Sequence, residues 1–110
     1  MQERRSSRRY PVLLEARVTI VGTQQSYEGK VTDIGFTGVR FVCNEKIEKD
    51  QKLELILSIE EQDITLKAVV VWAAKLEDLE GIQHGMQVVG VAFVGDSKKL
   101  EKFFKNIQGQ

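Results

Sequence analysis

The chain contains one cysteine, Cys43, and one histidine, His84, among its 110 residues. A single cysteine excludes an internal disulfide and is typical of a reducing compartment, so we expect a cytoplasmic location. A structural zinc site uses about four ligands, mostly Cys and His, and would be short of them here. Because the sequence offers no Ser/His/Asp set and no metal cluster, it predicts a protein without enzymatic activity. We expect Cys43 to be a small core or edge residue and His84 to lie in a polar loop.

Long apolar runs are also missing. No stretch approaches the ~18–20 residues of a transmembrane helix, and the basic N-terminus lacks the apolar segment of a signal peptide. The 16 basic residues balance the 16 acidic ones, so the formal net charge is zero. The molecule as a whole therefore does not attract a nucleic-acid polymer. Any site for an anion must be local.

Arginine is concentrated at one place. Four of the six arginines fall within residues 4–9, and ten lysines supply most of the other basic residues. Arginine has a planar fork of donors that binds phosphate bidentately and stacks on aromatic faces, whereas lysine does neither well. The cluster fits a phosphate ligand that carries aromatic bases, or alternatively a solubilising chain end.

Apolar and polar residues alternate along most of the chain, which is typical of half-buried strands. The pattern predicts strands at about residues 14–20, 27–33, 39–43, 53–59, 64–73 and 86–94. A glycine-punctuated turn at 33–38 joins the second strand to the third. Towards the C-terminus, Leu100, Phe103, Phe104 and Ile107 have helical spacing, with Asp96 or Ser97 as the N-cap. Six antiparallel strands and one amphipathic helix predict an all-β barrel or sandwich, with the helix over one open end or one face.

The aromatic residues fall mostly at core-like positions. The fifth strand is apolar on both faces near its end, which favours burial on both sides. We therefore expect Trp72, Phe93, Phe103 and Phe104 to lie in the core. A barrel that binds single-stranded nucleic acid would need exposed aromatics beside basic residues, so this function is disfavoured.

Two features are placed to meet at one rim of a barrel: the arginine cluster just before the first strand and the turn that begins at Asp33. Guanidinium groups suit phosphates and the Hoogsteen edge of guanine. A carboxylate suits the N1–H and N2–H₂ donors of the guanine Watson–Crick edge, and glycine lets a backbone come close. Asp33 could instead stabilise its own turn. Arg40, just past the turn, could face a ligand or pair with an acidic neighbour.

These residues resemble the PilZ domain family, whose bacterial members bind the second messenger cyclic di-GMP. The family pattern is RxxxR before the first strand and (D/N)x(S/A)xxG after it. Arg5 and Arg9 match the first motif, and Asp33 and Gly38 match the second. Residues 10–12, 69–72 and 90–94 and the closing helix are also similar to the family. The resemblance implies a six-stranded antiparallel β-barrel of split-barrel type at 12–110 with a C-terminal amphipathic α-helix, and a flexible arginine-rich arm at 1–11.

The resemblance also implies a function in second-messenger signalling. The chain would bind cyclic di-GMP without a further cofactor, and ordering of the arm on the ligand would change a surface for a downstream protein partner. The expected ligand-binding residues are Arg4, Arg5, Arg8, Arg9, Asp33, Gly35, Gly38 and Arg40. Gly35 departs from the family pattern, because Ser or Ala is usual there and glycine cannot supply a hydroxyl. The alternative is a PilZ-like protein-interaction domain that has lost nucleotide binding.

Overall fold

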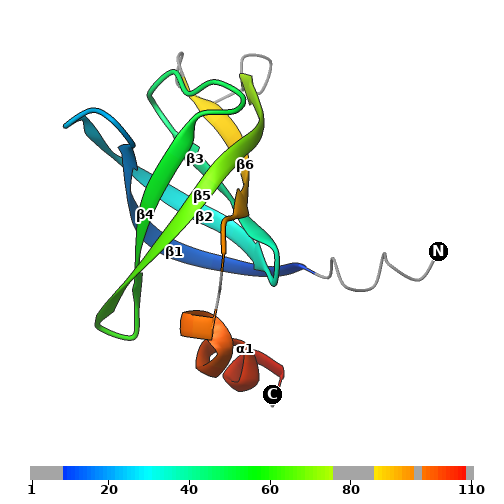
Figure 1. The fold of residues 1–110 in the computed structure, drawn as a ribbon. Coiled ribbons are helices and arrows are strands. Elements are labelled where there is room, and N and C mark those ends of the chain that lie inside the picture. Colours follow the sequence, from blue (N-terminus) through cyan, green and yellow to red (C-terminus); the bar gives the residue numbers. More distant parts are fainter. Residues whose placement is uncertain (1–8, 76–85, 96–97, 109–110) are drawn as a thin grey trace.

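The strands of the described residues close into one antiparallel barrel (Figure 1). The computed structural model describes residues 9–75, 86–95 and 98–108. The order around the barrel is β1-β2-β3-β6-β5-β4, which confirms the predicted all-β barrel and excludes the sandwich. The strands are β1 (Arg9–Ile20), β2 (Ser26–Gly35), β3 (Gly38–Cys43), β4 (Lys52–Ile59), β5 (Gln62–Lys75) and β6 (Gln87–Phe93).

Regular alternation builds the core of the barrel. In β4, Leu53, Leu55 and Leu57 are fully buried, and the residues between them point outward. Each of these side chains contributes about 1.5–3 kcal/mol when it leaves water. Cys43 is buried as well, and burial raises the pKa of its thiol. Closure of the barrel removes the unpaired sheet edges that promote aggregation.

The first strand begins earlier than predicted. β1 pairs with β2 from Arg9, opposite Gly35, whereas we predicted that residues 9–11 belong to the flexible arm. Pro11 is compatible with this strand because β4 pairs with β1 only from Ala16 onward, so the first half of β1 has one neighbour. The predictions for residues 1–8, for His84 and for the N-cap at 96–97 lie outside the described residues.

The C-terminal helix, α1 (Glu101–Gln108), follows a short 3-10 helix, Lys98–Leu100. Its residue Phe104 is 3% exposed and packs against two barrel residues. The ring centroids are 4.3 Å apart for Phe36 and 6.2 Å apart for Tyr10. The helix therefore packs where β1 begins and where β2 turns into β3 (Figure 1). Within the described ranges, no helix is both long and apolar enough to cross a membrane.

Candidate functional site

Residues from distant parts of the sequence form one row across the outside of the barrel. Pro11 of β1 pairs with Asp33 of β2, and Asp33 pairs with Arg40 of β3. Arg40 pairs with Gly90 of β6, which pairs in turn with Trp72 of β5. Neighbouring strands lie about 4.8 Å apart, so Asp33 and Trp72 are separated by three strand spacings, at most about 15 Å. The row brings a carboxylate, a guanidinium and an indole to the same surface.

Asp33 is the electrostatic centre of this row. Arg9 Nε donates a hydrogen bond to Oδ1, and Arg40 Nε donates one to Oδ2 at 2.8 Å. The Thr32 hydroxyl lies 3.3 Å from the same Oδ2. The Asp33 side chain is only 14% exposed, whereas Arg9 is 35% exposed and Arg40 is 41% exposed. One mostly buried carboxylate therefore holds two arginine side chains that are partly exposed.

The environment keeps the Asp33 carboxylate ionised. Burial opposes the charged form and alone would raise its pKa. The hydrogen bonds from Arg9 and Arg40, together with the charges of both guanidinium groups, outweigh burial and hold the pKa below its ordinary value. At neutral pH the site therefore contains one anion and two cations, with a local net positive charge.

A β-bulge in β2 aims Asp33 at this surface. Val31 is buried, and strict alternation would point Asp33 inward as well. β2 instead has one extra residue opposite β3 between Val31 and Asp33, so Ile34 takes the next buried position. The sequence predicted that Asp33 leads the turn, but the structure places it inside β2, and only residues 36–37 lie between β2 and β3. Its carboxylate joins neighbouring strands, and the cross-strand pairing anticipated for Arg40 is present.

A second bulge, in β5, turns Trp72 outward. Leu66, Ala68 and Val70 are buried, so alternation predicts a buried Trp72. The register shifts between Val70 and Trp72, and Trp72 is 41% exposed while Val71 beside it is also exposed. The prediction of Trp72 as a core residue was therefore wrong, and so was burial of this strand on both faces. Seven apolar residues in a row, 68–74, were the break in alternation that could have indicated the bulge.

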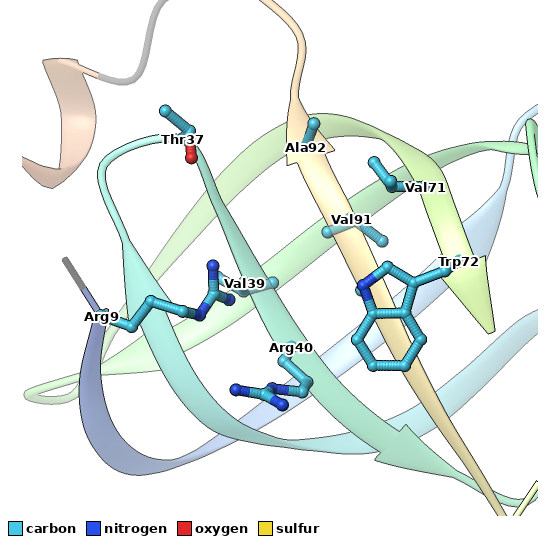
Figure 2. Close-up of a pocket in the computed structure, with 9 residues that line it drawn as sticks. Arg9, Thr37, Val39, Arg40, Val71, Trp72, Val91 and Ala92 are labelled. Atoms are coloured by element: carbon cyan, nitrogen blue, oxygen red, sulfur yellow. The ribbon is translucent and has the colours of Figure 1, made fainter. Parts of the chain in front are cut away.

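Between the arginines and the indole lies an open pocket of about 320 Å³. Figure 2 shows the Arg9 and Arg40 guanidinium groups on one side of it and the Trp72 ring lying over β6 on the other. The lining is apolar except for the arginines and one threonine: Arg9, Thr37, Val39, Arg40, Val71, Trp72, Gly90, Val91 and Ala92. Of the expected ligand-binding residues, Arg9 and Arg40 line this pocket and Asp33 holds both of them. Trp72 is the member of the site that the sequence missed.

The glycines of the turn motif have different surroundings. A Cβ at Gly38 would lie 1.9 Å from the Val91 carbonyl oxygen, so β3 needs glycine there to approach β6. Gly35 is buried opposite Arg9 in the β1–β2 ladder. In the part of the chain that the structure describes, Gly22 and Gly95 are the glycines with positive φ, so a left-handed backbone is not the reason for either motif glycine.

The remaining expected residues, Arg4, Arg5 and Arg8, lie outside the described residues. Residues 9–75, 86–95 and 98–108 contain no group of three or more His, Cys, Asp and Glu side chains suited to a metal ion. The described site thus offers two guanidinium forks of the kind that binds phosphate, one carboxylate that can accept from N–H groups and one aromatic face. This set matches a ligand that has both anionic groups and planar bases.

Comparisons with known proteins agree with the fold. Residues 2–107 match the family model of the PilZ domain. Among solved structures, the chain is similar to the PilZ domain with c-di-GMP of YcgR from Escherichia coli, with a TM-score of 0.73 and 11% sequence identity. The alignment covers 94% of this chain and 88% of that one. A search of curated proteins gives no match. Since the family match spans the barrel and the closing helix, the chain belongs to the PilZ domain family.

Proposed function

We propose that this protein is a cytoplasmic bacterial receptor for cyclic di-GMP that works by binding and not by catalysis. The observation that carries the proposal is the pair of guanidinium groups, Arg9 and Arg40, held by Asp33 beside an open pocket. Family membership supports the ligand class, and the similar YcgR domain was solved with c-di-GMP. Phosphate and guanine together need cationic forks and an acceptor for N–H groups, and the row supplies both.

Binding would rearrange the contacts of Asp33. The two carboxylate oxygens offer about four lone-pair positions. Arg9 and Arg40 donate to two of them, and the single Thr32 hydroxyl proton is directed either to Oδ2 or to the Arg40 carbonyl oxygen. Of the residues that donate hydrogen bonds to Asp33, Arg9 lies nearest to the N-terminus. If a phosphate draws its guanidinium away, Oδ1 becomes free to accept from the N1–H or N2–H₂ of guanine. Arg40 would remain on Oδ2 and keep the carboxylate in place.

The arm would complete the site. Arg4, Arg5 and Arg8 precede Arg9 in the sequence, and we propose that they close over the ligand and add charge-assisted contacts of about 1.5–3 kcal/mol each. Gly35 lacks the hydroxyl usual in the family, which removes about 0.5–1.5 kcal/mol for one neutral hydrogen bond. The arginine contacts together exceed that loss, so we expect binding to survive the departure at Gly35.

The aromatic contacts of α1 offer a route from the ligand to a partner surface. Tyr10 follows Arg9, Phe36 precedes Thr37 of the pocket, and both rings pack on Phe104. Movement of either segment on ligand binding would therefore change how α1 sits on the barrel. We expect cyclic di-GMP to alter hydrogen exchange at the α1 amides by severalfold. Unchanged exchange in α1 at saturating ligand would contradict this route without affecting the binding proposal.

Calorimetry tests the proposed function directly. We expect cyclic di-GMP to give a saturable heat of binding at tens of micromolar or below. Cyclic di-AMP should bind at least tenfold more weakly, because adenine presents an acceptor at N1 where guanine presents a donor and would leave the Asp33 carboxylate unpaired. Absence of heat from a folded protein would contradict the proposal and favour the protein-interaction alternative.

A further inference from the structure

A second hollow lies on the outside of the barrel, over β4 and β5 and beside the ends of β1 and β6. Its volume is about 320 Å³, and none of its lining residues lines the pocket of Arg9 and Arg40. We call it the apolar hollow, because five of its eight lining residues are apolar. The proposed nucleotide site leaves this hollow unused.

Exposed valines flank the apolar hollow. Val21, just after β1, is 55% exposed, and Val94, just after β6, is 51% exposed. Val69 of β5 lies between them and is half-buried. A single exposed apolar residue needs no explanation. Several such residues around one hollow, with charged residues at its rim, are typical of a protein-binding surface.

The rim carries charges of both signs. Lys52 and Glu54 belong to β4, and Lys67 belongs to β5. Glu54 and Lys67 are directly opposite each other in the β4–β5 ladder, where opposite charges commonly pair. Among the residues that the structure describes, however, none of the three takes part in an ion pair. One carboxylate and two ammonium groups are therefore available to another molecule.

The order of these groups across the strands is self-complementary. The strands run β1-β4-β5-β6 around this part of the barrel, and Figure 1 shows β4 and β5 side by side. A twofold axis parallel to the strands, between β4 and β5, would place Glu54 of one copy opposite Lys67 of a second copy. The same axis would place Val21 on the side of the second copy's Val94, so that each apolar flank meets an apolar flank.

We propose that the apolar hollow binds a second copy of this chain and forms a twofold dimer. Burial of the valines supplies the attraction, and the two Glu54–Lys67 pairs fix the register. The formal net charge of zero adds no general repulsion between copies. This inference goes beyond the proposed function and does not depend on it. The dimer face would adjoin the nucleotide pocket, because Val69 pairs with Ala92, which lines that pocket.

Analytical ultracentrifugation of the full chain without nucleotide tests the dimer. The dimer fraction should rise with concentration and exceed one half below about 1 mM protein. Val94→Asp places a charge in the apolar contact and should weaken association at least tenfold. Leu13→Asp is the matched control, because Leu13 is 81% exposed on β1 and does not line the hollow. A wild type that stays monomeric would overturn the proposal, and so would equal weakening by both variants.

A charge swap tests the register. Lys67→Glu and Glu54→Lys each place like charges opposite one another, so each variant alone should be monomeric. An equimolar mixture should form a heterodimer, and a chain with both substitutions should dimerise with itself at unchanged net charge. Glu45→Lys and Lys46→Glu, in the exposed loop after β3, change the net charge equally and should dimerise like the wild type. If circular dichroism shows folded variants but the mixture and the double variant stay monomeric, this dimer face is wrong.

Discussion

Replacing Arg9 with alanine should weaken cyclic di-GMP binding by roughly tenfold to 150-fold. A hydrogen bond to a charged group contributes about 1.5–3 kcal/mol, and each 1.4 kcal/mol corresponds to about tenfold in affinity. Arg9 is placed to bind phosphate because it lines the pocket and pairs with Asp33. The barrel should remain folded, since Arg40 still holds the carboxylate at 2.8 Å. Calorimetry measures the change in affinity.

Arg17→Ala is the matched control for Arg9. Arg17 lies on the same strand, is exposed and lines a different surface hollow, so its removal lowers the net charge equally without touching the site. We expect affinity within twofold of the wild type. Arg9→Lys should give an intermediate loss, because lysine keeps the charge but not the bidentate fork. Equal losses for Arg9→Ala and Arg17→Ala would show that the arginines act only through overall charge.

The architecture was predictable because buried and exposed residues alternate regularly along most of the barrel. In β4 the buried leucines occur at every second position, and a single sequence displays this pattern directly. The helix was equally visible, since Leu100 and Phe104 keep the spacing of a buried face and are both buried. These elements bury apolar side chains without any local irregularity, so periodicity was enough to find them.

The geometry of the site was not predictable, because it depends on places where this alternation of buried and exposed residues is interrupted. Each bulge adds one residue and reverses which face the following side chains occupy. Reversal at β2 brings Asp33 outward to Arg9 and Arg40, and reversal at β5 brings out Trp72. A bulge depends on how two strands pair across the sheet, which the sequence of one strand does not specify. The motif singled out Asp33, and pairing with an acidic neighbour was one of two readings for Arg40, but the cross-strand register was needed to identify Asp33 as that neighbour.

The glycines also show which features a local sequence pattern reveals and which it does not. The turn motif singled out Gly38, and both backbone freedom and ligand approach were reasonable explanations for it. The structure gives a third explanation, because the residue lies where β3 passes closest to β6. That contact joins segments about fifty residues apart in the sequence, and no local pattern encodes it. The consequence is that Gly38 supports the site by holding the strands that line the pocket together.

Replacing Gly38 with alanine should therefore lower the melting temperature by more than about 10 °C. The added Cβ would lie 1.9 Å from the Val91 carbonyl oxygen and 3.1 Å from Ala92 Cα, and both atoms are backbone. The clash is relieved only if β3 and β6 separate, which we expect to destabilise the barrel by about 3 kcal/mol or more. Gly90→Ala is the matched control in β6, because the three atoms nearest to its Cβ belong to the partly exposed Trp72 ring, which can swing into solvent. Thermal unfolding followed by circular dichroism should separate the two variants clearly, and similar melting temperatures for Gly38→Ala and the wild type would contradict the close packing of β3 on β6.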